Sequence, residues 1–257
     1  MEKSFYQNSG VTIITRMVSS KREITYIKAD SKNRRTSRTR KLLCWLFVDL
    51  VVAAVIIGLL LHKPGSYDPT DFDSAGYEPG QVSPYLTHEL SPRIYNGVQR
   101  DEPFDLVITQ KGINEIVTGW GWPKMSHGVM LYSPAVLFKP GSALLMATAN
   151  VRGAEFVVTL EIKPKIDEKG LLTFHISKVK VGAMNVTAIA KITARKMYLQ
   201  RIAHLPIDKE AVQTKIAESL LNDALFEPVF KVDDRKVRID KITVSKEKLT
   251  AHLAPAS

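Results

Sequence analysis

The sequence predicts an α+β protein in which a single N-terminal transmembrane helix precedes an exported domain. Two observations predict this class. A run of twenty residues, Leu42 to Leu61, is almost entirely apolar and long enough to cross a membrane. After residue 103 the chain shows strand-like alternation and helical stripes, separated by glycine and proline turn signals. That mixture indicates antiparallel strands combined with helices.

The apolar run has the composition of a membrane-spanning helix. Fourteen of its residues are Leu, Ile, Val or Phe, and at about 1.5 Å rise per residue it spans roughly 30 Å, the thickness of a bilayer's hydrocarbon core. Asp49 is its single acidic residue. Two interpretations of Asp49 stay open: a tolerated acid held by a partner helix, or an oligomer contact or proton relay.

Charge on either side of the run predicts its direction. The flank before it carries Lys32, Arg34, Arg35, Arg38, Arg40 and Lys41. By the positive-inside rule the N-terminus is cytoplasmic and the rest of the chain is exported, periplasmic if the protein is bacterial. The run exceeds a signal peptide's apolar core and lacks a small-x-small site behind it, which favours an uncleaved anchor. Residues 1–41 are expected to be a disordered basic tail, with Met17 as an alternative start.

The net charge of +10 does not by itself indicate nucleic-acid binding. Much of the excess lies before the apolar run, where topology explains it. Residues 104–257 still hold twenty-two Lys or Arg against fifteen acids, which suits contact with anionic lipid or envelope polymer. The only cysteine, Cys44, excludes an intrachain disulfide and a cysteine-based metal site.

Residues 62–103 have the composition of a linker. They contain six of the thirteen prolines, so we expect a proline-rich spacer that lets the exported domain rest on the membrane or work away from it. The domain itself is expected over residues 104–257, enough for one core without disulfides.

The first elements of this domain are a strand and a short helix. Phe104 to Ile108 alternates, Thr109 is a candidate N-cap, and the helical stripe ends at Gly119. Further strands follow, with turns at 139–142 and 167–170 and a bulge near Ser177. They are expected at Val129 to Phe138, Ala143 to Val151, and around residues 156–162 and 172–176.

Two helices and two strands complete the predicted domain. Thr187 to Ile202 is rich in Ala, Lys and Arg. A second helix begins after Pro206 with Asp208 as its cap and carries an apolar stripe to Leu225. The last strands are expected at Lys236 to Val244 and Leu249 to Leu253.

This order resembles the membrane-anchored extracytoplasmic proteins of the YpmS and LmeA type, related to the TULIP lipid-binding superfamily. The segments that carry the resemblance follow the strand and short helix and cover about 150 residues. They are Ala135-Val136-Leu137-Phe138, the step Lys163-Pro164-Lys165-Ile166-Asp167 into Gly170, Val179 to Gly182, a long helix, and a terminal hairpin ending at Pro255. The resemblance implies a curved antiparallel sheet wrapped around a long helix, with an apolar groove for acyl chains. A longer linker and a Lys/Arg-rich helix after Gly182 depart from the pattern.

Three side chains in one loop are candidates for contact with lipid or membrane. Trp120, Trp122 and Met125 lie in a glycine- and proline-containing loop, where indoles could form an interfacial lip or plug the core. Met130 and Met146 could line a soft apolar pocket or fill the core.

The candidate headgroup contacts lie on the helix after Gly182. Lys191, Arg195, Lys196 and Arg201 could attract phosphate groups or form a solvated basic face.

No motif predicts catalysis or a cofactor. The sequence lacks G-x-S-x-G, a P-loop, a dinucleotide fingerprint and an H-x-x-x-H pair, so no cofactor, metal site or nucleic-acid binding is expected. An enzyme is not expected either, and a hydrolase built from residues far apart in the sequence is the third interpretation. The sequence instead predicts a membrane-anchored envelope protein that binds a lipid or another amphipathic ligand. The alternative is an adaptor that binds an envelope protein and has a fully packed interior.

Overall fold

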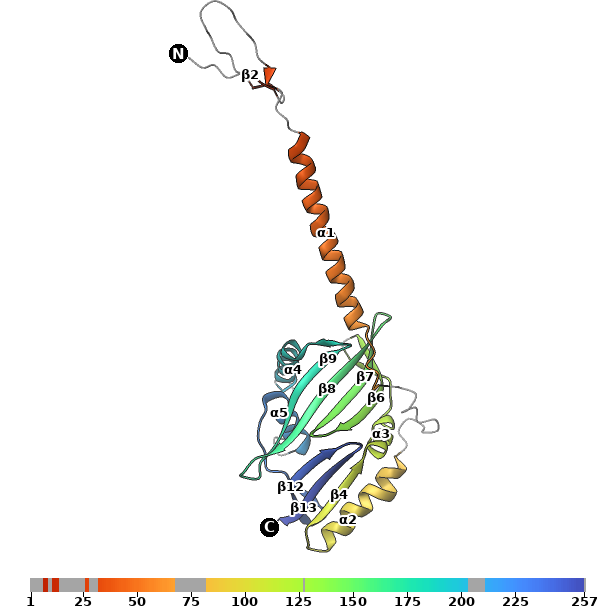
Figure 1. Ribbon diagram of the computed structural model, residues 1–257. Coiled ribbons are helices and arrows are strands. Elements are labelled where there is room, and N and C mark those ends of the chain that lie inside the picture. The colour runs from red at the N-terminus through yellow and green to blue at the C-terminus, as the bar shows by residue number, and fades with distance from the viewer. Residues whose placement is uncertain are drawn as a thin grey trace, which may run out of the picture. The chain divides into compact units, whose positions relative to one another are not determined.

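The computed structural model describes residues 7–8, 11–13, 26–27, 32–67, 82–126, 128–202 and 211–256. The chain divides into two compact units, residues 1–56 and 57–257. The predicted α+β class is confirmed, because helices accompany two antiparallel sheets in the second unit (Figure 1).

The first unit contains three short strands and most of helix α1 (Lys32–Leu60). The strands are β1 (Gln7–Asn8), β2 (Val11–Ile13) and β3 (Tyr26–Ile27), paired antiparallel in that order. The disorder expected for residues 1–41 stays a prediction.

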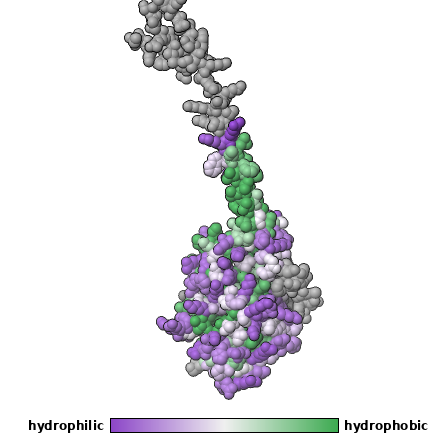
Figure 2. All heavy atoms as spheres, in the orientation of Figure 1, coloured by the Kyte–Doolittle hydropathy of each residue, from purple (hydrophilic) through white to green (hydrophobic). Residues whose placement is uncertain are grey.

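Helix α1 begins in the basic flank and continues through the apolar run. Thr39–Leu60 is the one helical stretch in the described ranges that is long and apolar enough to cross a membrane. Figure 2 shows the apolar surface that follows polar residues along this helix. Length and composition thus agree with the predicted span.

A six-stranded antiparallel meander forms the larger sheet of the second unit, in the order β10-β9-β8-β7-β6-β5. The predicted turns at 139–142 and 167–170 are confirmed as the β6–β7 and β8–β9 connections. So is the bulge, since Ser177 has no partner between the pairs Glu161–Lys178 and Ile162–Ile176. The strands are β5 (Lys124–Ser126), β6 (Val129–Lys139), β7 (Ser142–Val151), β8 (Ala154–Ile166), β9 (Leu172–Val181) and β10 (Met184–Asn185).

The smaller sheet joins the start of the predicted domain to its end. Its order is β11-β12-β13-β4, all antiparallel, so the resemblance's single curved sheet is replaced by two sheets. The last strand pairs with the first because both alternate apolar residues that need a common core. The strands are β4 (Phe104–Thr109), β11 (Val229–Val232), β12 (Arg235–Ser245) and β13 (Lys248–Ala256).

Part of the predicted linker is helical and belongs to the domain, so a linker over 62–103 is wrong for residues 82–103. This stretch forms the π-helix η2 (Tyr85–Leu90) and helix α2 (Ser91–Gln99), which contacts β4 and β12 (Figure 1). The Tyr85 ring lies so close to Gly112 that a Cβ there would be 2.3 Å from it. Pro84 and Pro92 lie at the starts of η2 and α2, where a missing N–H costs little.

Tyr67 anchors the chain soon after the end of α1. Its ring is buried in a core cluster with Ala135, Leu144, Met146 and Val157. Its hydroxyl donates to the Ser133 carbonyl oxygen at 2.6 Å and lies 2.8 Å from Thr148 Oγ1. Residue 67 therefore belongs to the domain as well.

Helix α3 (Gln110–Thr118) begins as predicted, with Thr109 Oγ1 accepting from Gly112 N at 3.1 Å, and ends at Gly119. Its amide side chains form hydrogen bonds with backbone groups on the free edge of β6. Asn114 Oδ1 accepts from Val136 N at 2.6 Å, and Asn114 Nδ2 donates to the Val136 carbonyl oxygen at 2.8 Å. Gln110 Oε1 accepts from Phe138 N at 2.8 Å.

The last two helices lie beside β9 (Figure 1). They are α4 (Thr187–Ile202), with the predicted bounds, and α5 (Val212–Asn222). Helix α5 is fixed by the fully buried Ser219, whose Oγ accepts from Phe174 N at 2.7 Å. Asp208, the predicted cap, lies outside the described residues.

The substitution Asn114→Ala should destabilise the second unit strongly. It leaves the buried N–H and carbonyl of Val136 without partners, and each unmet group costs about 1–3 kcal/mol. Urea unfolding of a fragment spanning residues 62–257 would measure the loss. Asn150→Ala is the matched control, because its hydrogen bond to Gly153 N is exposed. Equal unfolding free energies for the two variants would contradict the assigned role of Asn114.

Stability should also fall at alkaline pH. Burial raises the pKa of Tyr67 and Tyr198, and a hydrogen bond to Glu155 raises the pKa of Tyr132 to about 12. The folded state keeps these protons after the unfolded chain loses them near its ordinary pKa of about 10. The stabilising contribution is therefore complete below about pH 10 and is lost as pH rises toward about 12. Urea unfolding at about pH 9 and about pH 11 checks this, and Tyr132→Phe should reduce the drop.

Candidate functional site

Helices α4 and α5 enclose an open groove that collects three of the four predicted headgroup residues. Its volume is about 770 Å³, within the range of small-molecule sites. The wall is mixed: apolar Ile192, Leu199 and Leu221 alternate with cationic Lys191, Arg195 and Lys196. The fourth predicted residue, Arg201, belongs to α4, but its side chain lies outside the described residues.

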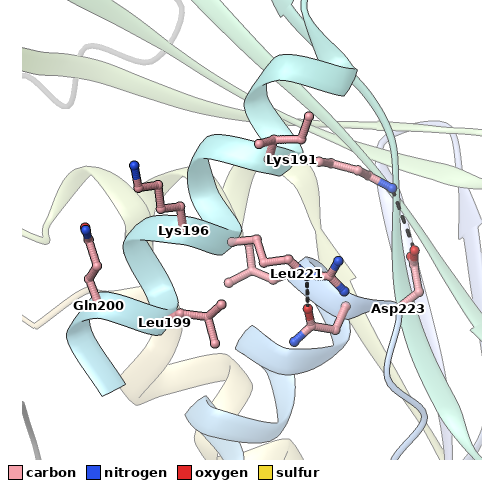
Figure 3. A pocket seen from close by; sticks show the side chains of 9 residues that line it. Lys191, Lys196, Leu199, Gln200, Leu221 and Asp223 are labelled. Carbon is pink, nitrogen blue, oxygen red and sulfur yellow. Dashed lines mark hydrogen bonds and ion pairs between the residues drawn. The ribbon is translucent and has the colours of Figure 1, made fainter. Parts of the chain in front are cut away.

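The three cations differ in their interaction partners. Lys191 Nζ lies 3.8 Å from Asp223 Oδ2, and Arg195 Nε donates to Asn222 Oδ1 at 2.7 Å. Figure 3 shows Lys191 reaching toward Asp223 while Lys196 extends away from it. Lys196 has no hydrogen bond or ion pair within the described part of the chain. Its ammonium group is thus available to an external anion.

Asp223 sits where α5 ends, in the left-handed backbone region with φ 53°. Asp tolerates this conformation better than most residues because its short side chain can bond locally. The carboxylate faces Lys191 and lies 2.7 Å from His175 Nδ1 on β9. One carboxylate against three cations leaves the groove positively charged.

The groove's apolar wall is open to solvent. Ile192 is 71 % exposed and Leu199 is 59 % exposed, which is unusual for branched aliphatic side chains on a helix. Apolar surface beside cations can bury an acyl chain while pairing with a negative headgroup.

The three residues of the predicted aromatic lip differ in their exposure to solvent. Trp120 is 60 % exposed and Met125 is 74 % exposed. Trp122 is half-buried, donates through Nε1 to the Val117 carbonyl oxygen at 2.8 Å, and carries Lys124 Nζ 5.4 Å from its ring centre. The hydrogen bond of Trp122 therefore fixes the loop to the end of α3, and the side chains of Trp120 and Met125 are exposed to solvent.

A second, smaller hollow of about 350 Å³ lies beside Trp120, lined also by Val82, Leu86 and Ile116. It shares no lining residue with the α4–α5 groove. Trp120 and the predicted headgroup contacts therefore line separate hollows, and Trp120 is the one predicted lipid contact that lines the smaller hollow.

The two predicted methionine contacts differ in access. Met146 is only 4 % exposed and packs in the core cluster around Tyr67, so in this conformation it fills the core. Met130 is half-buried on β6. Asp49 lies in α1, exposed, and contacts no charged or polar partner among the described residues.

Two His–Asp pairs escaped the sequence analysis because their members are far apart in the chain. His175 meets Asp223, and His252 Nδ1 lies 2.7 Å from Asp105 Oδ1 on the smaller sheet. In the described ranges no group of three or more His, Cys, Asp or Glu side chains could hold a metal ion.

Sequence reasoning found the cations of the groove and missed its apolar wall. The signal was present: Ile189, Ile192 and Leu199 recur at helical spacing on the same helix as the cations. Leu221 and Asn222 could not be assigned, since their place beside α4 depends on how both helices pack against β9.

Comparisons of the chain with protein-family models, with curated proteins and with solved structures find no match. The fold and the groove therefore define only a broad class, a mixed α+β domain that follows a long apolar helix.

The two loop tryptophans should respond differently to substitution. Trp122→Phe removes the hydrogen bond to Val117 and should cost about 1 kcal/mol of unfolding free energy. Trp120→Phe, at an exposed site, should change it by no more than about 0.5 kcal/mol. Urea unfolding of the 62–257 fragment measures both. A larger loss for the Trp120 variant would reverse the assignment.

Proposed function

We propose that this chain is a single-pass membrane protein whose C-terminal unit binds a lipid or another single-chain amphiphile in the α4–α5 groove. The observation that carries the proposal is the pairing in one open groove of exposed aliphatic residues with three cations. A ligand with an acyl chain and a negative headgroup matches both halves of this wall.

The anchoring helix supports this location. Its long apolar side chains have large exposed fractions, an arrangement that costs free energy in water and is favourable in a bilayer. The six cations before the apolar run favour a cytoplasmic N-terminus and an extracytoplasmic domain, facing the periplasm in a bacterium. A reporter fused to the C-terminus that is active only in the cytoplasm would overturn this orientation.

Burial of the acyl chain would supply most of the binding free energy. Each methylene removed from water contributes about 0.8 kcal/mol, so about ten methylenes buried against Ile192, Leu199 and Leu221 would correspond to the roughly 8 kcal/mol of micromolar binding. Lys196, which has no partner among the described residues, and the Nη groups of Arg195 provide donors for a carboxylate or phosphate.

The resemblance to the TULIP superfamily enters at this point as part of the proposal. In that architecture a curved sheet and a long helix form the walls of an acyl-chain groove. Here helices α4 and α5 would supply the walls, and β9 supports them from behind, because both helices contact that strand.

One observation favours the alternative of an adaptor without a ligand. The clusters between strands and helices are filled by protein side chains such as Val157 and Phe138. An adaptor would use a sheet edge or the basic face of α4 to bind an envelope protein.

Ile192→Gln should weaken binding of a fluorescent fatty acid to the 62–257 fragment by about tenfold, since it removes apolar contact worth about 1.5 kcal/mol. Ile189→Gln is the matched control, because Ile189 lies on the same helix, is equally exposed and does not line the groove. Fluorescence titration measures both affinities. The fragment starts at residue 62 so that Tyr67 keeps its place in the core.

Native mass spectrometry of the same fragment would test for a copurified lipid. Absence of both lipid and fatty-acid uptake would exclude the groove as a ligand site and favour the adaptor. Equal affinities for the two isoleucine variants would place the ligand elsewhere.

A further inference from the structure

We infer that the outer face of helix α4 docks on an anionic bilayer surface, so that the groove exchanges its ligand with the membrane directly. This inference rests on the proposed membrane anchoring and concerns a different face of the helix from the one that packs against the domain.

Helix α4 differs from an ordinary surface helix because aliphatic side chains lie on its solvent-exposed face. Thr187, Ala190, Ala194 and Tyr198 are half-buried toward β9 and α5. The opposite side carries Ile189, Ile192 and Leu199, which are 70 %, 71 % and 59 % exposed. A helix that only faced water would carry polar residues there.

Cations accompany these aliphatic residues. Lys196 falls between Ile192 and Leu199 on the outer side, and Arg195 stands at its margin. Exposed aliphatic residues beside Lys and Arg are the pattern of helices that lie in the plane of a membrane interface. Positive charge selects anionic lipid over neutral lipid.

The connection before α4 places its first turn near the end of α1. Ala183 N donates to the Leu59 carbonyl oxygen at 2.8 Å, and a Cβ on Gly182 would lie 2.3 Å from the same oxygen. Helix α4 starts at Thr187, a few residues later. If α1 leaves the bilayer at Leu60, Ile189 and Ile192 lie within a few helical turns of the membrane surface, given about 1.5 Å rise per residue.

Docking has a consequence for the ligand. Ile192 and Leu199 belong both to the exposed face and to the groove wall. A docked α4 therefore opens the groove toward lipid, and an acyl chain can pass from bilayer to groove without crossing bulk water.

The test uses the full chain in nanodiscs and exploits its single cysteine. In a Cys44→Ser background, Ile192→Cys carries a fluorophore and the lipids carry a nitroxide quencher. Lys231→Cys, exposed on β11 in the smaller sheet, is the matched control position. Quenching is compared between discs of phosphatidylglycerol with phosphatidylcholine and discs of phosphatidylcholine alone.

We expect strong quenching at position 192 in the anionic discs, less in the neutral discs, and little at position 231 in either. Lys196→Gln should lower the ratio of docked to undocked protein by about fivefold, the usual effect of one cation at an anionic surface. Ile189→Gln should also weaken docking while it leaves fatty-acid affinity unchanged.

Equal quenching at positions 192 and 231 in anionic discs would overturn the docking. Fatty-acid titration of the 62–257 fragment without a bilayer separates the two proposals. A fragment that binds fatty acid, with no selective quenching at 192, refutes docking alone. Selective quenching with no fatty-acid binding refutes the groove function alone.

Discussion

The free edge of strand β6 is the constraint on which the arrangement of the second unit depends. Strand β5 pairs only with the beginning of β6, at residues 129–131, so the rest of that edge needs other partners. Asn114 and Gln110 of α3 supply them through side-chain amides. The smaller sheet completes the edge through its own turn, where Glu247 N donates to the Phe138 carbonyl oxygen at 3.4 Å. Edge satisfaction and burial of α3 thereby join the two sheets around one core cluster.

Local chemistry made much of this fold predictable. Thr109 as a cap, the Lys139–Ser142 turn and the bulge at Ser177 each depend on a few neighbouring residues, and all three are confirmed. The linker predicted for residues 82–103 is wrong because proline content alone does not distinguish a spacer from helices that begin at proline. The apolar stripe of Leu90, Ile94 and Val98 at four-residue spacing was the competing signal, and burial of that stripe against β4 and β12 decided the outcome. The split into two sheets depends on long-range pairing of β13 with β4, which no local pattern specifies.

The candidate site was predictable in its charges and not in its shape. Cations on one helix are visible in the sequence, but a groove needs a second wall, and the position of α5 follows from Ser219 and the β9 backbone. For the methionines, residue type was visible in the sequence and burial was not. Met146 and Met125 are chemically alike, yet one fills the core and the other is presented to solvent, because only the register of each strand decides which side chain faces inward.

The burial of Tyr67 has a mechanical consequence. Tyr67 is the seventh residue after Leu60, the end of α1, and an extended chain covers at most about 3.5 Å per residue, or roughly 25 Å in all. For a membrane-spanning α1, the tether between the membrane and the domain is thus short, in place of the long proline-rich spacer that the sequence predicts. A short tether raises the effective concentration of the domain at the surface to the millimolar range. Contacts with the bilayer that are too weak to recruit a free protein would then be enough to keep the tethered domain bound to the bilayer surface.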